Sequence, residues 1–240
     1  MFLKNNMKFI VDKKVFEKIP NLYIGVVVAY DIDNEKHYSD IIKLLNDIQL
    51  SYEEKFKNIS LREQKNIAAY RTIFKELGIN PNKYMSSIEA MSKRILSGKN
   101  LPSINPVVDL VNYISLNNIV PMGAHDIDQL AGNIHIRFSK DLDEFTPLGT
   151  DKKEVLKSGE LVYSDDEVIR TRRWIWRQSS RGKIDKTSRN IFFPIDGFVG
   201  VNEQSVNNAM NDIEKLLKKY FDCEIKVGII SKNNSEMNLF

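Results

Sequence analysis

The longest run of mainly apolar residues covers 22–30 and is rich in β-branched and aromatic side chains. A strand with one face in water alternates apolar with polar residues, so this run predicts a strand buried on both faces. In the segment 133–138, Ile134, Ile136 and Phe138 alternate and are expected to share one face. Further strands are predicted at 161–163, 168–178, 190–195 and 224–230.

Five segments carry apolar residues at the spacing of a helix with one buried face. They cover residues 37–57, 61–77, 86–96, 107–116 and 202–221. Gly78 stands at the C-terminal cap of the second helix, and Pro81 prevents its continuation. Asn105 and Pro106 suit the cap and the first position of the fourth helix. Since strands and helices follow one another without an internal repeat or a long linker, the pattern predicts an α+β fold that packs as one unit.

Composition narrows the class of protein. The chain has 240 residues and is 42% hydrophobic, which is enough for a core in one domain or two tightly joined subdomains. The formal net charge of +3 excludes an acidic disordered tail protein and a histone-like polycation. The longest apolar run is about half the length of a membrane helix, and no secretory signal is evident. The single cysteine, Cys223, cannot form an internal disulfide, so we expect a soluble, cytoplasmic protein.

The near-neutral total hides one strongly basic segment. Residues 170–189 contain eight basic residues and one acid, Asp185, and they include both tryptophans, Trp174 and Trp176. Guanidinium groups neutralise phosphates and indole rings stack on bases. Such a segment is therefore typical of a protein that binds single-stranded nucleic acid.

If residues 170–178 form a strand, its side chains alternate between two faces. One face then carries Arg172, Trp174, Trp176 and Gln178, and the other carries Arg173, Ile175 and Arg177. The alternative interpretation places the tryptophans in the core and the arginines on a solvated or internally paired face. The residues alone favour neither interpretation.

Catalytic and metal-binding motifs are scarce. The histidines are His37, His125 and His135, and His125 lies in the segment Gly123-Ala-His-Asp-Ile-Asp128. A histidine with two aspartates could ligate a metal or act as a general base. A turn in which an aspartate caps the next short segment is the commoner use of this pattern and is favoured here. We expect Cys223 to be a packing residue.

Several separated blocks agree in order and spacing with one known family. They are Val107-Val-Asp-Leu-Val-Asn-Tyr-Ile114, Val120-Pro-Met-Gly-Ala-His-Asp126, Asp128-Gln-Leu-Ala-Gly132 and Phe145-Thr-Pro-Leu-Gly149. Together they resemble the editing region, the B3/B4 domain, in the beta chain of bacterial phenylalanyl-tRNA synthetase. Outside this region the chain resembles freestanding members of the same family. The blocks of that wider resemblance are Tyr70 to Gly78, Ser87 to Ala90, Arg172 to Gln178, and Asp196-Gly197.

The resemblance implies a mixed β-sheet sandwich with flanking helices, built from two interleaved halves. It runs over about residues 20–232, with 101–150 as the B3-like half and 155–232 as the B4-like half. Residues 1–20 are then an N-terminal extension and residues 233–240 a tail. In the synthetase this domain hydrolyses tyrosine wrongly esterified to tRNA. Freestanding relatives deacylate mischarged tRNA, including tRNA that carries the arginine analogue canavanine.

The synthetase pocket is only partly kept in this sequence. Its Thr-Asn pair corresponds to Val111-Asn112, so the threonine is lost. Its histidine falls on Gly123, and His125 appears two positions later. Its glutamate would fall near Phe193-Pro194, where no acid occurs. We therefore expect a shared scaffold with a rebuilt pocket, and the tyrosine specificity is not transferred.

The leading hypothesis is a trans-editing aminoacyl-tRNA deacylase without a metal or another cofactor, because a positioned water can attack the ester. Asn112 and His125 are the candidate catalytic residues, with His125 as the polar group or base. Gly123, Asp126 and Asp109 are the candidate substrate-binding residues. Either aspartate could receive a cationic side chain, although capping is the favoured role of Asp109.

The expected partner is the aminoacylated 3′ end of tRNA, with no role for DNA or a membrane. The residues expected to hold the terminal nucleotides are Arg173, Trp174, Trp176, Arg177 and Gln178. Two alternatives stay open: a non-catalytic RNA-binding module and an amino-acid-binding sensor. No oligomeric state is predicted.

Overall fold

The computed structural model describes residues 7–240. The helices are α1 (Lys13–Lys18), α2 (Ser39–Lys55), α3 (Lys65–Glu76), α4 (Ser87–Leu96), α5 (Pro106–Asn118) and α6 (Glu203–Phe221). The longer strands are β1 (Lys8–Val11), β2 (Leu22–Tyr30), β4 (Ile134–Phe138), β7 (Leu161–Ser164), β8 (Ile169–Arg172), β10 (Ile191–Phe198) and β11 (Glu224–Ile230). The short elements are β3 (His125–Asp126), the 3-10 helix η2 (Ile127–Gln129), β5 (Glu144–Phe145), β6 (Glu154–Val155), β9 (Arg177–Gln178) and β12 (Glu236–Asn238).

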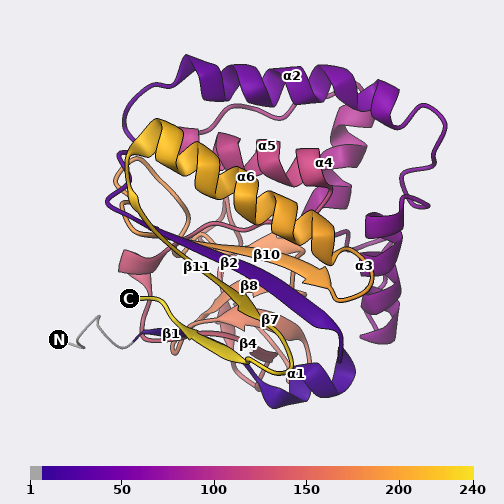
Figure 1. Cartoon of the computed structure of the whole chain (residues 1–240). Coiled ribbons are helices and arrows are strands. Elements are labelled where there is room, and N and C mark those ends of the chain that lie inside the picture. The colour runs from indigo at the N-terminus through magenta and orange to yellow at the C-terminus, as the bar shows by residue number, and fades with distance from the viewer. Residues whose placement is uncertain (1–6) are drawn as a thin grey trace.

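Two sheets and a layer of helices are stacked on one another (Figure 1). The larger sheet has the order β12-β1-β4-β7-β8-β9 and contains one parallel pair, β1 with β4, among antiparallel pairs. The smaller sheet has the order β11-β2-β10-β3 and is antiparallel. Helices α5 and α6 cover its outer face, and α2 packs on α5. The predicted α+β sandwich with flanking helices is confirmed.

Strand β2 lies between two layers, which explains its apolar sequence. Val26 and Val28 belong to the core between the sheets, whereas Val27 and Ala29 pack beneath α5 and α6. All four side chains are fully buried. The prediction of a strand buried on both faces is therefore confirmed.

Strand β10 pairs with β2 along its whole length and also alternates between two buried faces. Ile191, Phe193 and Ile195 pack on the helical side, whereas Phe192 and Phe198 pack toward the larger sheet. Because side chains repeat every second position, Asp196 shares the face of these two phenylalanines. A carboxyl group thus enters the core between the sheets.

The chain passes repeatedly between the two sheets. The larger sheet contains β1, β4, β7, β8, β9 and β12, whereas the smaller one contains β2, β3, β10 and β11. Strands β1 and β12 pair directly, so both ends of the described chain lie in one sheet. The helix α1 and the strands β1 and β12 were not predicted. The domain limits at residues 20 and 232 stay a prediction.

The segment 168–178 does not form the single strand that its composition predicted. Strand β8 ends at Arg172, and residues 173–176 form a turn that leads into β9. Arg173 and Trp174 have φ angles of 45° and 60°, in the left-handed region that reverses the chain direction in tight hairpins. The predicted division of this segment into two faces is therefore wrong.

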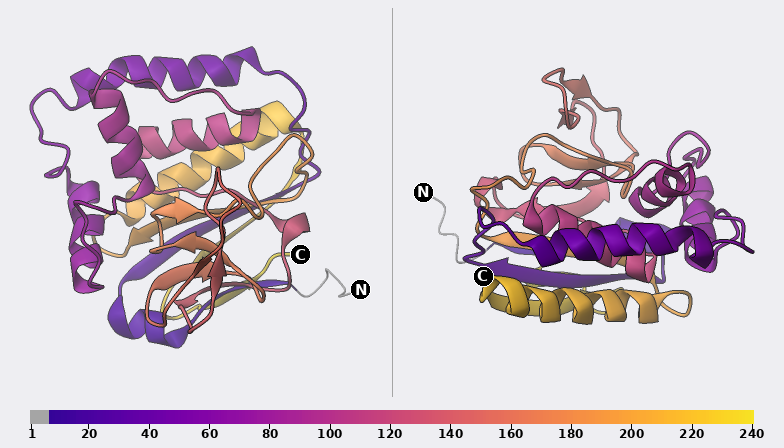
Figure 2. Two further views of the ribbon diagram at one scale, coloured as in Figure 1. Left: turned by 180° about the vertical axis from the view of Figure 1, so that it is seen from behind. Right: turned by 90° about the horizontal axis from the view of Figure 1, so that it is seen from above.

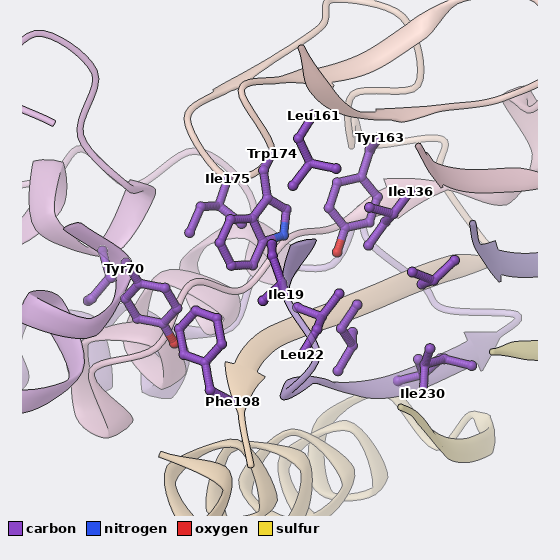
Figure 3. Packing of buried hydrophobic residues seen from close by; sticks show 14 of the residues in the cluster. Ile19, Leu22, Tyr70, Ile136, Leu161, Tyr163, Trp174, Ile175, Phe198 and Ile230 are labelled. Carbon is purple, nitrogen blue, oxygen red and sulfur yellow. The ribbon is translucent and has the colours of Figure 1, made fainter. Parts of the chain in front are cut away.

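The turn places Trp174 in the core between the sheets (Figure 3). Its ring is fully buried and lies edge-on to Tyr70 of α3 and to Phe198 of β10, at centroid distances of 6.2 and 5.8 Å. On the other side of the molecule from α6, the segment that carries β5 and β6 projects outward (Figure 2). The buried indole of Trp174 anchors the turn in the core.

Candidate functional site

A small hollow opens beside Trp174, between the two sheets. It has a volume of about 160 Å³, and we call it the tryptophan hollow. Its lining includes Gly123, His125, Tyr163, Trp176, Gln178 and Asp196. These residues come from four separate parts of the chain, so only the folded sandwich brings them together.

A larger hollow of about 530 Å³ adjoins the first, and we call it the apolar hollow. Met91 of α4, Val108 and Val111 of α5, and Ile184 supply much of its wall. Asn112 also lines it. The two hollows share the lining residues Ser87, Met122, Gly123 and Gln178. A ligand with two parts could therefore occupy both across this shared wall.

Asp196 is the ionisable group that sequence reasoning missed. Its Oδ1 accepts hydrogen bonds from the Tyr163 hydroxyl at 2.8 Å and from the Trp174 indole nitrogen at 2.7 Å. Figure 3 shows these two donors pointing toward the same space. Burial raises the pKa of Asp196 to about 7, and the two hydrogen bonds only partly offset this effect. The available signal was an acid at a core-facing position in the otherwise apolar segment 191–198.

His125 also lines the tryptophan hollow, from strand β3. Its ring stacks on Tyr163 at 6.0 Å and contacts Phe192 at 6.1 Å. Burial, assisted by the positive charge of Arg170, lowers the pKa of His125 to about 3. A neutral imidazole with so low a pKa is a weak general base. Of the two roles expected for His125, its environment favours that of a polar lining group.

Gly123 lies at the wall between the two hollows. Its backbone N–H donates to the carbonyl of Pro194 at 2.9 Å, which ties the segment to β10. A Cβ atom at this position would lie 3.2 Å from Pro194 Cγ and 3.3 Å from His125 Nε2. The absence of a side chain therefore keeps this wall thin.

The two aspartates proposed for substrate binding are engaged in local structure. Asp126 caps η2 by accepting from the backbone N–H of Asp128 at 2.9 Å, and it also accepts from the hydroxyl of Ser188 at 2.8 Å. It lies outside the lining of both hollows. Asp109 accepts from Ser103 and from the backbone of Ile104, as expected for a capping residue. The structure thus favours capping over substrate binding for both.

The aromatic residues of the basic segment differ in accessibility. Trp174 is fully buried, so its indole cannot stack on a base, which corrects the role expected for it. Trp176 is half-buried at the tryptophan hollow and lies edge-on to Tyr84 at 4.8 Å. The Arg173 guanidinium lies over both rings, 3.8 Å from the Tyr84 centroid and 4.8 Å from that of Trp176. Both tryptophans line the hollow, and of the two Trp176 is the one that keeps accessible surface.

The arginines of this segment also separate into two groups. Arg172 forms two 2.8 Å hydrogen bonds with the carboxylate of Glu160, and Arg173 lies 3.3 Å from the same carboxylate. Arg177 is exposed at the rim of the tryptophan hollow, and no carboxylate of residues 7–240 pairs with it. Gln178 donates to the carbonyl of Ala124 at 3.0 Å and lines both hollows. Arg177 and Gln178 therefore both lie at the tryptophan hollow, and their binding of terminal nucleotides stays a prediction.

Neither hollow has the donor set of a metal centre. Within the described part of the chain, no three histidine, cysteine or acidic side chains are grouped so that they could hold a metal ion. Over the same residues, no helix is both long and apolar enough to cross a membrane.

Known proteins similar in sequence to this chain match less than half of its length. Over 112 residues it is 38% identical to the phenylalanine–tRNA ligase beta subunit of Fusobacterium nucleatum, which covers 46% of this chain and 14% of that protein. Over 90 residues it is 36% identical to the corresponding subunit of Idiomarina loihiensis, covering 38% of this chain and 11% of that protein. The chain therefore spans only a small part of these relatives.

A solved structure and a family model match longer stretches. An N-terminal fragment of the phenylalanyl-tRNA synthetase beta-subunit from Pyrococcus horikoshii aligns with 92% of this chain and 50% of that chain, with a TM-score of 0.46 and 13% identity. The family model described as B3/4 domain matches residues 69–222, which include both hollows' shared wall. The resemblance found in the sequence blocks is confirmed. This chain belongs to the B3/4 domain family.

Proposed function

We propose that this protein hydrolyses the ester bond of mischarged aminoacyl-tRNA. The relatives named above are subunits of a tRNA ligase, which supports a tRNA ligand. The observation that carries the proposal is Asp196, a buried carboxyl group with a pKa of about 7 in a hollow that adjoins a larger apolar one. A general base is most effective when its pKa lies near the working pH.

The sizes of the two hollows favour one division of the substrate. The amino-acid side chain enters the smaller tryptophan hollow, and the terminal nucleoside occupies the larger apolar hollow beside Asn112. The ester then lies at the shared wall, next to Gly123 and Gln178. Trp176 and Arg177 at the rim contact the terminal nucleotide. Asn112 in this arrangement contacts the nucleoside rather than the amino acid.

The reaction is the attack of water on the ester carbonyl carbon. Asp196 in its ionised form accepts a proton from the water while the new C–O bond forms. The bond to the ribose oxygen then breaks, and that oxygen takes the proton that Asp196 accepted, which gives the free hydroxyl of tRNA and returns Asp196 to its ionised form. The products are an uncharged tRNA and a free amino acid. Neutral His125 donates or accepts a hydrogen bond within the hollow without changing its charge.

A deacylation panel tests the proposal. tRNAs charged with a range of non-cognate amino acids are mixed with the wild-type protein, and the release of amino acid is followed. We expect release from at least one of them, and a loss of about 10²- to 10⁴-fold in rate for Asp196→Asn. Asn112→Ala should raise KM, because it removes a contact to the nucleoside. Lys215→Ala, an exposed change on α6, should leave the rate unaltered.

Two outcomes would replace the proposal. If no tRNA is deacylated although tRNA binds with a clear salt dependence, the protein is a non-catalytic RNA-binding module. If free amino acids raise the melting temperature and tRNA has no effect, it is an amino-acid sensor. An Asp196→Asn variant that folds and retains the full rate would remove Asp196 from the mechanism.

A further inference from the structure

Most cations of the basic segment are neutralised within the protein. Carboxylates pair with the guanidinium groups of Arg170, Arg172, Arg173, Arg181 and Arg189. Arg177, Lys183 and Lys186 have no carboxylate of residues 7–240 within ion-pair distance, and all three are exposed. The one acid of the segment, Asp185, accepts hydrogen bonds from the N–H and hydroxyl of Thr187 at 2.8 and 2.7 Å, which lower its pKa, so it stays ionised. The three cations therefore outnumber this acid and leave a net positive charge.

Each of these three cations lines a hollow. Arg177 lines the tryptophan hollow, and Lys183 lines the apolar hollow. Lys186 lines the apolar hollow and also a third one of about 200 Å³, which we call the outer hollow. The order of the three residues along the chain is thus the order of the hollows.

The outer hollow adjoins the apolar hollow and shares no lining residue with the tryptophan hollow. It shares Ile104, Asn105 and Lys186 with the apolar hollow. Its remaining lining is largely polar and includes the exposed residues Lys36 and His37. It also includes two acids, Glu35, which pairs with Arg189, and Asp109, which accepts from Ser103 and Ile104. Three adjoining hollows therefore form one track, which is apolar in the middle and has unpaired cations along it.

We propose that this track binds the single-stranded 3′ end of an RNA beyond its last nucleotide, with the phosphates on Lys183 and Lys186 and with Arg177 at the end that carries the 3′ hydroxyl. This inference rests on the proposed function for the direction of the strand. The terminal nucleoside lies in the apolar hollow, and the preceding nucleotide lies in the outer hollow. Lys183 and Lys186 are the new binding residues of this proposal. The arginines at 170, 172, 173, 181 and 189 already form ion pairs within the protein.

Salt dependence gives the measurement. Each phosphate contact to a single strand contributes about 0.7 to the slope of log affinity against log salt concentration. A labelled, uncharged RNA oligonucleotide with a single-stranded CCA 3′ end is titrated with protein at several salt concentrations, and anisotropy is recorded. Lys183→Ala and Lys186→Ala should each lower the magnitude of the slope by about 0.7, and the double variant by about 1.4. Lys215→Ala is the matched control and should leave the slope unchanged.

The outcome decides the inference separately from the proposed function, because the oligonucleotide carries no ester. Unchanged slopes in Lys183→Ala, Lys186→Ala and the double variant would overturn the proposal. Equal binding of an RNA whose 3′ end is closed in a duplex would also overturn it, because the hollows would then not be used. If the slopes fall as expected while no mischarged tRNA is deacylated, the track stands and the proposed hydrolysis fails.

Discussion

Burial acts on the two ionisable side chains of the tryptophan hollow in the same direction. It favours the neutral form of each, so the pKa of Asp196 rises to about 7 and that of His125 falls to about 3. Near neutral pH the hollow therefore holds a carboxyl group that changes its charge and an imidazole that does not. We therefore expect a pH dependence of the proposed hydrolysis around pH 7 to follow the ionisation of Asp196.

Replacing Asp196 by Asn separates catalysis from stability. The unfolded carboxyl titrates near 3.9, so between about pH 4 and pH 7 the folded state holds the extra proton. Stability of the wild type therefore falls as pH rises through that range, by up to about 1.4 kcal/mol per pH unit. Asp196→Asn cannot lose this proton. We expect its melting temperature to gain on the wild type between pH 5 and pH 8, while its deacylation rate falls.

Thermal unfolding at several pH values, recorded for both proteins, gives the comparison. A difference in melting temperature that stays constant from pH 5 to pH 8 would contradict the raised pKa of Asp196.

For His125 we expect stability to change with pH in the opposite direction, on the acid side. An unfolded histidine titrates near 6.5, so between about pH 6.5 and pH 3 the unfolded state binds the extra proton. Stability is then lost as pH falls through this range. His125→Phe, which keeps an aromatic ring beside Tyr163, should unfold at a lower pH than the wild type in an acid titration followed by circular dichroism. An imidazole NMR signal of His125 that moves between pH 5 and pH 8 would show that the residue titrates there.

At the scale of elements, the approach of α6 to β2 depends on Gly25. A Cβ atom at this position would lie 2.5 Å from Met210 Sδ and 2.9 Å from Val206 Cγ1. Gly25→Ala therefore overpacks this contact and should destabilise the protein by about 1–3 kcal/mol. Because Met210 is flexible, Met210→Ala in the same chain should recover part of the loss.

A double-mutant cycle in chemical denaturation measures this coupling. Losses that simply add would mean that the two residues do not meet.

The turn at residues 173–176 explains why this segment was assigned wrongly from the sequence. Aromatic and β-branched residues alternate there as in a strand. The hydrogen bond from Trp174 to Asp196 and the ion pairs from Arg172 and Arg173 to Glu160 instead hold the chain in a left-handed turn. These partners lie 12 or more residues away, so a short sequence window does not contain them.

At the scale of the whole molecule, the end of the described chain is part of the sandwich. Strand β12 pairs with β1, and Leu239 is fully buried. The carbonyl of Leu239 also accepts a hydrogen bond from the Tyr30 hydroxyl. Removal of residues 236–240 should therefore cost at least about 2 kcal/mol, from the lost burial of one leucine and the lost strand pairing.

Equilibrium denaturation of the shortened chain provides the measurement. A matched variant with polar substitutions at the exposed residues Lys232 and Asn233 should unfold as the wild type does. Equal stability of the shortened chain would show that β12 adds nothing to the sheet.

The sequence by itself determined the features that depend on neighbouring residues. Periodicity located five helices, the doubly buried strand β2 and strand β11, and the predicted cap Asn105 accepts from the backbone N–H of Val108. The blocks over residues 101–150 were also enough to identify the B3/4 domain family. Periodicity, caps and sequence blocks can all be found within a short stretch of sequence, because each depends on the spacing of residues along the chain.

The tertiary structure alone decided which groups form the site. Asp196 is one acid among 32 Asp and Glu residues until Tyr163 and Trp174 enclose it between two sheets. The segment 170–189 contains eight cations, and five of them form ion pairs with carboxylates of the folded protein. Arg177, Lys183 and Lys186 have no such carboxylate among residues 7–240. Burial and ion pairing are set by residues far away in the chain, so the charge available to a ligand follows from the packing of the sandwich.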